Sequence, residues 1–439
     1  MNELLPVLLV TVAGAVLVAL SSVGLSRRER KWVTATFFMH FGFACSQVPI
    51  VLSFYGSSDM FLYFSYGEIL ARMMERDPLH VIPEVTTLLL HGLPHLPMTI
   101  IGAGTATGSM SALAAWSFYL IGPSKYATCI AFAMLSLCGK LAMYRAFRAN
   151  VDPTLRWPVA IATLFVPSFV FWSSGLIKEA VAVAGFGWIL YGVHLWIGEG
   201  RAVPGWVLMG LGAIPIMLIK PYIMFPLVLA VGSWYYWARS LRRGRLRIRP
   251  AAFAIASALG VGGIVVLGQQ FPEYAADSFS IHTYELQQVG RGLRAGSNYA
   301  LGAEIPTTLG AQLVYAPVAL LTSLFRPVIF EARGLLMLAN ALETTVLTVL
   351  FARILLTRNL GAIRRQIMDD PFLVFCIVFV VSFGIAVGLA STNLGTLSRY
   401  RSPILPFFAL LLFVLRRPAS VRSPASDVRS NPRSVLGAA

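Results

Sequence analysis

Long apolar stretches separated by short polar segments repeat along the whole chain. A stretch of about 20 apolar residues forms a helix that can cross about 30 Å of hydrocarbon. The pattern therefore predicts an all-α fold, a polytopic transmembrane helix bundle that occupies residues 1–417 as a single membrane domain. The apolar stretches are residues 4–25, 33–55, 101–121, 126–147, 157–172, 180–197, 203–219, 221–238, 250–269, 309–325, 334–352, 372–390 and 403–415.

The first stretch, residues 4–25, contains no charged residue, and the preceding MNELLP lacks the basic region of a signal peptide. The basic cluster RRERK follows this stretch. Basic loops beside membrane helices are typical of the cytoplasmic side. We therefore expect a first transmembrane helix whose N-terminus lies outside. The same rule assigns the other basic loops to the cytoplasm: 26–31, 145–156, 239–249, 353–365 and 416–433.

Strict alternation of all the stretches cannot place every basic loop in the cytoplasm. We expect 101–121 and 309–325 to be interfacial or re-entrant, which leaves about eleven crossings and a cytoplasmic C-terminus. Residues 57–100 and 270–333 then become outer loops with interfacial helices. The tail 418–439, rich in Ser, Pro and Arg, is predicted to be a disordered basic cytoplasmic segment.

Composition supports a membrane location. The chain is 57% hydrophobic and 12% charged, whereas soluble domains carry about 25% charged residues. The net charge of +16 is accounted for by arginines in the cytoplasmic loops, so no nucleic-acid partner is expected. The four cysteines show no metal-binding spacing, and nucleotide-binding motifs are absent. The sequence leaves the oligomeric state open.

The unusual polar residues gather in segments assigned to the outer side. In SSDMFLYFSYGE, Asp59 follows the second stretch, and a helix would place Tyr63 on the same face. The alternative is a solvated loop with aromatic interface anchors. In PSFVFWSSGLIKEA, Ser174 is a candidate N-cap, with Lys178 and Glu179 in the first turn of the next helix.

Lysine is rare here, with five against thirty arginines, so we expect Lys178 to meet an anionic partner near the outer surface. The alternative is a side chain that extends along the helix to water. Further cations border apolar stretches on the same side: Lys220, Arg326, Arg399 and Arg401. Guanidinium groups suit phosphate, because they donate two parallel hydrogen bonds.

Two charges fall inside apolar stretches, Lys140 and Glu343. They are expected to pair, or Lys140 to extend to the cytoplasmic side. His91 and His95 have a spacing of four, but the intervening Gly92 and Pro94 argue against a metal-binding helix face. We therefore expect no cofactor, with a divalent metal at the histidines as the alternative.

The segments PSFVFWSSGLIKEA, SLFRPVIFEA and LSRYRSPILPFF, with the acidic first outer loop, resemble those of C-type glycosyltransferases (GT-C) and related bacterial polysaccharide-assembly membrane proteins. Enzymes of that group take a sugar from a polyprenyl-phosphate carrier at the outer face of the cytoplasmic (inner) membrane. An acid of the first outer loop lies near their catalytic centre. The resemblance implies that Asp59 is this acid, with Glu68 second.

The resemblance implies a multi-pass membrane glycosyltransferase whose partners are membrane lipids and a polyprenyl-phosphate-linked sugar, in cell-surface polysaccharide or glycoconjugate assembly. A carboxylate would accept the proton of the acceptor hydroxyl, and cations would stabilise the phosphate leaving group. The alternatives are a polysaccharide polymerase of related fold and a lipid-linked-oligosaccharide transporter or flippase without catalysis. The expected binding residues are Tyr63, Lys178, Glu179, Lys220, Arg326, Arg399 and Arg401.

Overall fold

The computed structural model describes residues 3–50, 53, 58–242, 275–292, 297–302 and 306–418. The regular secondary structure of these residues is helical, and β pairing among them is confined to an isolated bridge between Asn298 and Asn393. The all-α prediction is thus confirmed for the described part. The predicted apolar stretch 250–269, most of the basic loop 239–249 and the predicted tail from residue 419 lie outside the described residues.

The helices follow the predicted apolar stretches closely. The first half contains α1 (Leu4–Ser21), α2 (Arg27–Ile50), α3 (Asp59–Arg76), α4 (Pro78–Leu89), α5 (Ala106–Ile121), α6 (Lys125–Asn150), α7 (Arg156–Ala160), α8 (Pro167–Phe171), α9 (Lys178–Val193), α10 (Ala202–Ile219) and α11 (Met224–Arg242). The second half contains α13 (Ala276–Gly292), α14 (Leu309–Gln312), α15 (Ala316–Phe325), α16 (Leu335–Thr357), α17 (Leu360–Met368), α18 (Pro371–Ala390), α19 (Leu394–Tyr400) and α20 (Leu405–Leu415).

Six of the described helices are long and apolar enough to cross a membrane: α1, α6, α9 with its continuation to Gly198, α10, α16 and α18. The pair α19 and α20, bent by 73°, would make a seventh. These helices support a membrane protein. The larger number of about eleven crossings, and the orientation, remain predictions.

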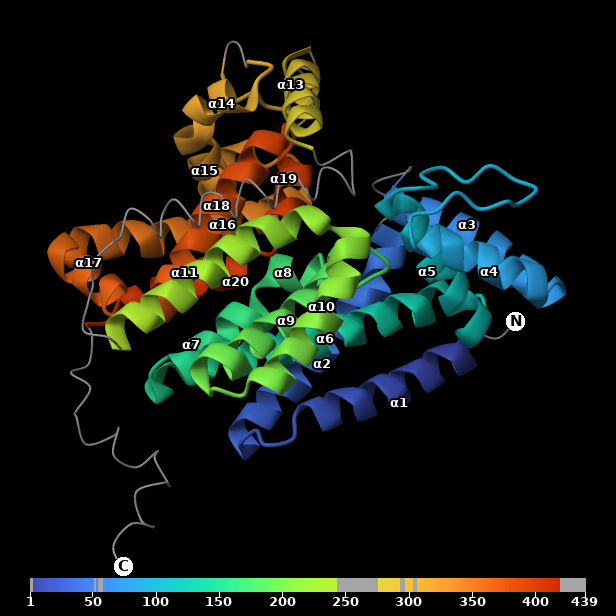
Figure 1. Cartoon of the computed structure of the whole chain (residues 1–439), viewed down its shortest axis with the longest axis horizontal. Helices are drawn as coiled ribbons and strands as arrows, with labels where there is room; N and C mark the ends of the chain where they lie inside the picture. The colour runs from blue at the N-terminus through green and yellow to red at the C-terminus, as the bar shows by residue number, and fades with distance from the viewer. Residues whose placement is uncertain are drawn as a thin grey trace, which may run out of the picture.

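Small residues bring the central helices of the first half into close contact. In Figure 1, α1, α6, α9 and α10 lie side by side, and α9 packs against both α6 and α10. A Cβ atom on Gly187 would lie 1.8 Å from the carbonyl oxygen of Gly139, and one on Gly185 would lie 2.4 Å from that of Gly212. Glycine at these crossings lets the backbones touch, as is common between membrane helices.

The predicted stretch 157–172 is a broken helix. The α7 helix continues into a π-helical turn at Ile161–Phe165, and Pro167 then begins the separate helix α8. Proline cannot donate a backbone hydrogen bond, which explains why the helix is interrupted there. The break matters for the site, because α8 leads directly into the turn that precedes α9.

The C-terminal helices form the other part of the core. The α18 helix packs against α11, α15 and α20, and Phe379 lies between Phe186 of α9 and Phe407 of α20, with ring centroids 5.2 Å and 4.6 Å away. Such aromatic contacts join the C-terminal helices to the N-terminal bundle. They bring α19, at the base of α20, close to the start of α9.

Candidate functional site

Asp59 is the first residue of α3, as the helical interpretation of this segment predicts. The hydroxyl oxygen of Ser58 accepts a hydrogen bond from the backbone N–H of Phe61 and caps the helix. One turn later Tyr63 is fully buried, whereas the Asp59 side chain is 53% exposed. The cap thus fixes a carboxylate at the surface directly above a buried tyrosine.

The turn before α9 is held by its own hydroxyl groups. Ser173 and Ser174 donate to the carbonyl oxygens of Phe169 and Val170, both at 2.6 Å. The prediction that Ser174 caps α9 is therefore wrong: the helix begins at Lys178 without a side-chain cap. A Cβ on Gly175 would lie 2.8 Å from the Gln47 side-chain oxygen of α2, so the turn packs closely against the end of this side chain.

Glu179 is the buried centre of the site. Its Oε1 accepts one hydrogen bond from the Lys220 ammonium at 2.6 Å and another from Nε of Arg399 at 2.8 Å. The side chain has no exposed surface, and Lys220 is also buried. Oε2 has no hydrogen-bond partner among the described residues. A carboxylate so placed is held by two cations and kept from bulk water.

Arg399 joins the buried acid to the exposed one. Its NH1 donates to Oδ2 of Asp59 at 3.1 Å while its Nε donates to Glu179. Asp59 and Arg399 are 340 positions apart in the sequence. The structure therefore brings Asp59, the predicted catalytic acid, and Glu179, an expected binding residue, to one guanidinium group.

Lys178 lies on the edge of this group. Its ammonium donates to the Thr107 hydroxyl at 3.0 Å, and it lies within electrostatic range of Asp59, Glu179 and Arg399. Burial raises the pKa of the Tyr63 hydroxyl, and the charge of Asp59 raises it further. Tyr63 is therefore protonated at neutral pH. We define the acid–cation cluster as Asp59, Tyr63, Lys178, Glu179, Lys220 and Arg399.

Two tyrosines complete the buried side of the acid–cation cluster. The Lys220 ammonium lies 5.8 Å from the ring centroid of Tyr222 and 5.0 Å from that of Tyr400. Cations are attracted to aromatic faces, most strongly where water is excluded. Neither tyrosine was expected from the sequence. Tyr222 lies two positions after Lys220 in LIKPY, and Tyr400 directly follows Arg399 in SRY. No feature of the sequence identified Thr107 as part of the site.

The charges of the acid–cation cluster do not balance. Three cations, Lys178, Lys220 and Arg399, face two carboxylates, Asp59 and Glu179, which leaves one positive charge in excess. Lys178 is the cation whose hydrogen bond goes to a neutral group. A partly buried cation without a carboxylate partner is unfavourable unless an anion joins it.

Arg326 and Arg401 lie in a different group. Arg401 is fully buried and donates from NH1 to the backbone carbonyl of Arg326 at 2.5 Å and from NH2 to Thr344 at 2.7 Å. Arg326 forms an ion pair with Glu331, and its guanidinium lies 4.5 Å from the Tyr299 ring centroid. Within the described residues, neither arginine forms a hydrogen bond or ion pair with the acid–cation cluster, so the structure does not bring these two expected binding residues to it.

The expected pair between Lys140 and Glu343 is not formed. Lys140 donates to His40 and to the carbonyl oxygen of Phe169, both at 3.1 Å. Glu343 accepts from the backbone N–H of Ser168 at 2.8 Å and from its hydroxyl. Each charge has its own partners, His40 of α2 and Phe169 of α8 for Lys140 and Ser168 of α8 for Glu343. The alternative that Lys140 extends to the cytoplasmic side is also wrong, because Lys140 is fully buried.

Glu68 lies on the surface of α3, where it pairs with Arg72 one turn later. Their side chains are 36% and 66% exposed, respectively. We expect Glu68→Gln to leave activity within about twofold of the original, and to change stability by less than about 1 kcal/mol. Activity measurements alongside thermal unfolding check this. A loss of activity of about 10²-fold or more would contradict this surface role of Glu68.

No group of three or more His, Cys, Asp or Glu side chains within the described ranges could hold a metal ion. His91 instead has its Nε2 2.7 Å from the Leu218 carbonyl oxygen. His95 is bonded through its backbone N–H to Glu84. The two histidines thus have separate partners, and the described structure offers nothing that favours the metal alternative.

Comparisons with protein-family models, with curated proteins and with solved structures found no match for this chain. The function must therefore be argued from the acid–cation cluster itself.

Proposed function

We propose that the chain is a membrane glycosyltransferase that takes a sugar from a polyprenyl-phosphate carrier at the outer face of the membrane. The observation that carries the proposal is Arg399, which holds the exposed carboxylate of Asp59 and the buried carboxylate of Glu179 together. One acid that can reach a substrate thereby lies beside an excess of positive charge.

Asp59 is the group suited to act as the base. It is half exposed, whereas Glu179 is buried and holds two cations. In the proposed reaction the acceptor hydroxyl oxygen forms a bond to the anomeric carbon while the bond from that carbon to the phosphate oxygen breaks. The hydroxyl proton passes to Asp59, and the electron pair leaves with the phosphate.

Lys178 and Arg399 are the groups suited to stabilise the leaving phosphate. Both lie at the rim with Asp59, and Lys178 can turn from the Thr107 hydroxyl to a phosphate oxygen. Charge develops on the phosphate as the bond breaks, so positioned cations lower the energy of the transition state. Glu179 keeps Arg399 and Lys220 in place and prevents them from collapsing onto Asp59 alone.

We expect Lys178→Met to weaken binding of polyprenyl phosphate by about tenfold or more, since a hydrogen bond to a charged group contributes about 1.5–3 kcal/mol. Titration of the purified protein with polyprenyl phosphate in detergent micelles measures the effect. Lys125→Met is the matched control, because Lys125 begins α6 and lies over the Phe64 ring, outside the acid–cation cluster. Equal affinities of the two variants would show that Lys178 does not contact the phosphate.

A further inference from the structure

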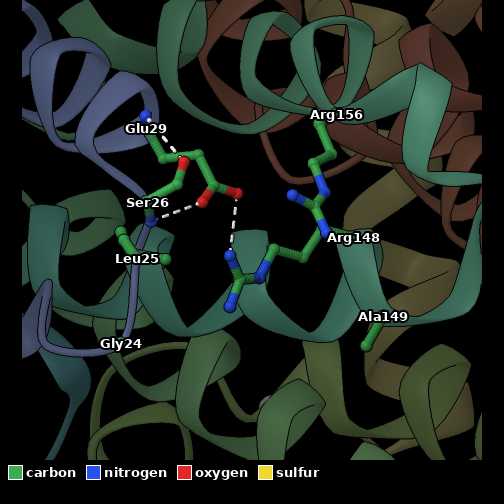
Figure 2. A pocket seen from close by; sticks show the side chains of 7 residues that line it. All are labelled: Gly24, Leu25, Ser26, Glu29, Arg148, Ala149 and Arg156. Atoms are coloured by element: carbon green, nitrogen blue, oxygen red, sulfur yellow. Dashed lines mark hydrogen bonds and ion pairs between the residues drawn. The ribbon is translucent and has the colours of Figure 1, made fainter.

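A cavity of about 520 Å³ lies at the opposite end of α2 from the acid–cation cluster. Glu29 is in the first turn of the 24-residue helix α2, whereas Gln47 near its other end packs against Gly175 beside α9. A helix rises about 1.5 Å per residue, so the two ends are about 30 Å apart. The cavity is lined by Gly24, Leu25, Ser26, Glu29, Arg148, Ala149 and Arg156 (Figure 2).

The Glu29 carboxylate in this cavity already accepts hydrogen bonds at both of its oxygens. Glu29 accepts hydrogen bonds from the Tyr144 hydroxyl and from Arg148, both at 2.7 Å, and from the backbone N–H of Ser26 at 2.8 Å. Burial alone would raise the pKa of Glu29, but these hydrogen bonds lower it to about 2. Ser26 in turn accepts from the Glu29 N–H, which completes a capping box at the start of α2.

Arg156 supplies a positive charge that Glu29 does not neutralise. In Figure 2 its side chain reaches into the same space as Arg148, from α7 rather than α6. Within the described ranges no carboxylate lies at ion-pair distance from Arg156, whereas Glu29 pairs with Arg148. Two guanidinium groups against one satisfied carboxylate leave the cavity with a net positive charge and free donors.

Tryptophans beside this cavity favour a position at a membrane interface. Trp157, which follows Arg156, is 42% exposed and contacts Trp32 with ring centroids 4.9 Å apart. Tryptophan is enriched where hydrocarbon meets headgroups. Leu20 and Val23, at the end of α1 and just before Gly24, are 65% and 68% exposed and offer apolar surface beside the cavity mouth.

We propose that this cavity binds the phosphate headgroup of an anionic membrane phospholipid. Arginine pairs bind phosphate through parallel hydrogen bonds, and basic pockets between membrane helices on the cytoplasmic side are suited to anionic headgroups. The phosphate lies between Arg148 and Arg156, and an acyl chain follows the exposed apolar face of α1. The start of α2, the end of α6 and the start of α7 line the cavity, on the side that the basic residues of segments 26–31 and 145–156 assign to the cytoplasm. The proposal is independent of sugar transfer.

The test is lipid binding to the full chain, measured by native mass spectrometry of protein released from micelles that contain phosphatidylglycerol or phosphatidylcholine. We expect the original protein to retain phosphatidylglycerol preferentially. Arg156→Gln should weaken this binding by about fivefold or more. Arg30→Gln removes an exposed arginine from the first turn of α2, outside the cavity lining, and is the matched control.

Equal losses of phosphatidylglycerol binding in Arg156→Gln and Arg30→Gln would show that the lipid is held by diffuse surface charge, and would overturn the proposal. Arg156→Lys should restore part of the affinity, because charge returns without the two-donor fork. Competition separates the two sources of phosphate. Inorganic phosphate at millimolar concentration should fail to displace the lipid; displacement that matches the loss in Arg156→Gln would mean that the cavity serves free phosphate and would overturn the assignment to a lipid.

Discussion

Replacing Asp59 by Asn is expected to lower the rate of sugar transfer by about 10²–10⁴, the usual contribution of a general base. The amide keeps the size of the side chain and can still contact Arg399, but it cannot accept the proton of the acceptor hydroxyl. Because the Asp59 side chain is 53% exposed, its ion pair contributes little to stability. The variant should therefore unfold at a temperature close to that of the original protein.

Glu68→Gln is the matched control for this prediction, since it makes the same chemical change on the same helix, nine positions after Asp59 and outside the acid–cation cluster. Radiolabelled lipid-linked sugar and the purified variants supply the measurement. Asp59→Asn with near-original turnover would place the base elsewhere and withdraw the role assigned to this helix end.

Glu179→Gln should destabilise the protein severely, by about 3–5 kcal/mol, because it leaves the buried Lys220 and the partly buried Arg399 without their common carboxylate. Lys220 and Arg399 both donate to the same Glu179 oxygen, and the neutral amide offers them no charge. The unfolding temperature of the detergent-solubilised protein and the yield of folded protein measure the loss.

The double variant Glu179→Gln with Lys220→Met tests whether the loss of stability comes from the unpaired charge of Lys220. Removal of the unpaired Lys220 should recover part of the lost stability, since a buried charge then disappears with its partner. A further loss in the double variant would show that Lys220 is stabilised mainly by the rings of Tyr222 and Tyr400, and that Glu179 is not the group that holds it.

Local sequence patterns predicted most helices because each helix depends mainly on its own apolar residues. The stretches 4–25 and 372–390 became α1 and α18 with ends within a few residues. The stretch 157–172 was predicted as one element, yet it is divided by a π-helical turn and by Pro167. A proline within an apolar run interrupts the helix only where neighbouring helices accommodate the break. That depends on the whole fold and not on the local sequence.

Part of the candidate site could be predicted from the sequence. Rare charges in apolar surroundings identified Asp59, Lys178, Glu179, Lys220 and Arg399, which the structure brings together. The pairing of these residues could not be predicted from the sequence, because it depends on the packing of α3, α9 and α19, and Asp59 and Arg399 are 340 positions apart.

The structure separates Arg401 from Arg399, and the spacing of these two arginines already implies this separation. Neighbouring positions on a helix point about 100° apart, so two residues separated by one position point to nearly opposite sides. Arg399 therefore faces Asp59 and Glu179, and Arg401 faces Thr344 and the backbone of Arg326. An account of helix faces, rather than of residue types alone, would have separated these arginines.

The turnover of a radiolabelled polyprenyl-phosphate sugar by the purified protein tests the proposed role of the acid–cation cluster most directly. We predict that sugar is transferred to an acceptor hydroxyl with release of polyprenyl phosphate, and that Asp59→Asn still binds the carrier but does not release it. Movement of the intact lipid-linked sugar across a vesicle membrane, with no cleavage of its sugar–phosphate bond and no difference between the original protein and Asp59→Asn, would contradict catalysis and favour a transporter.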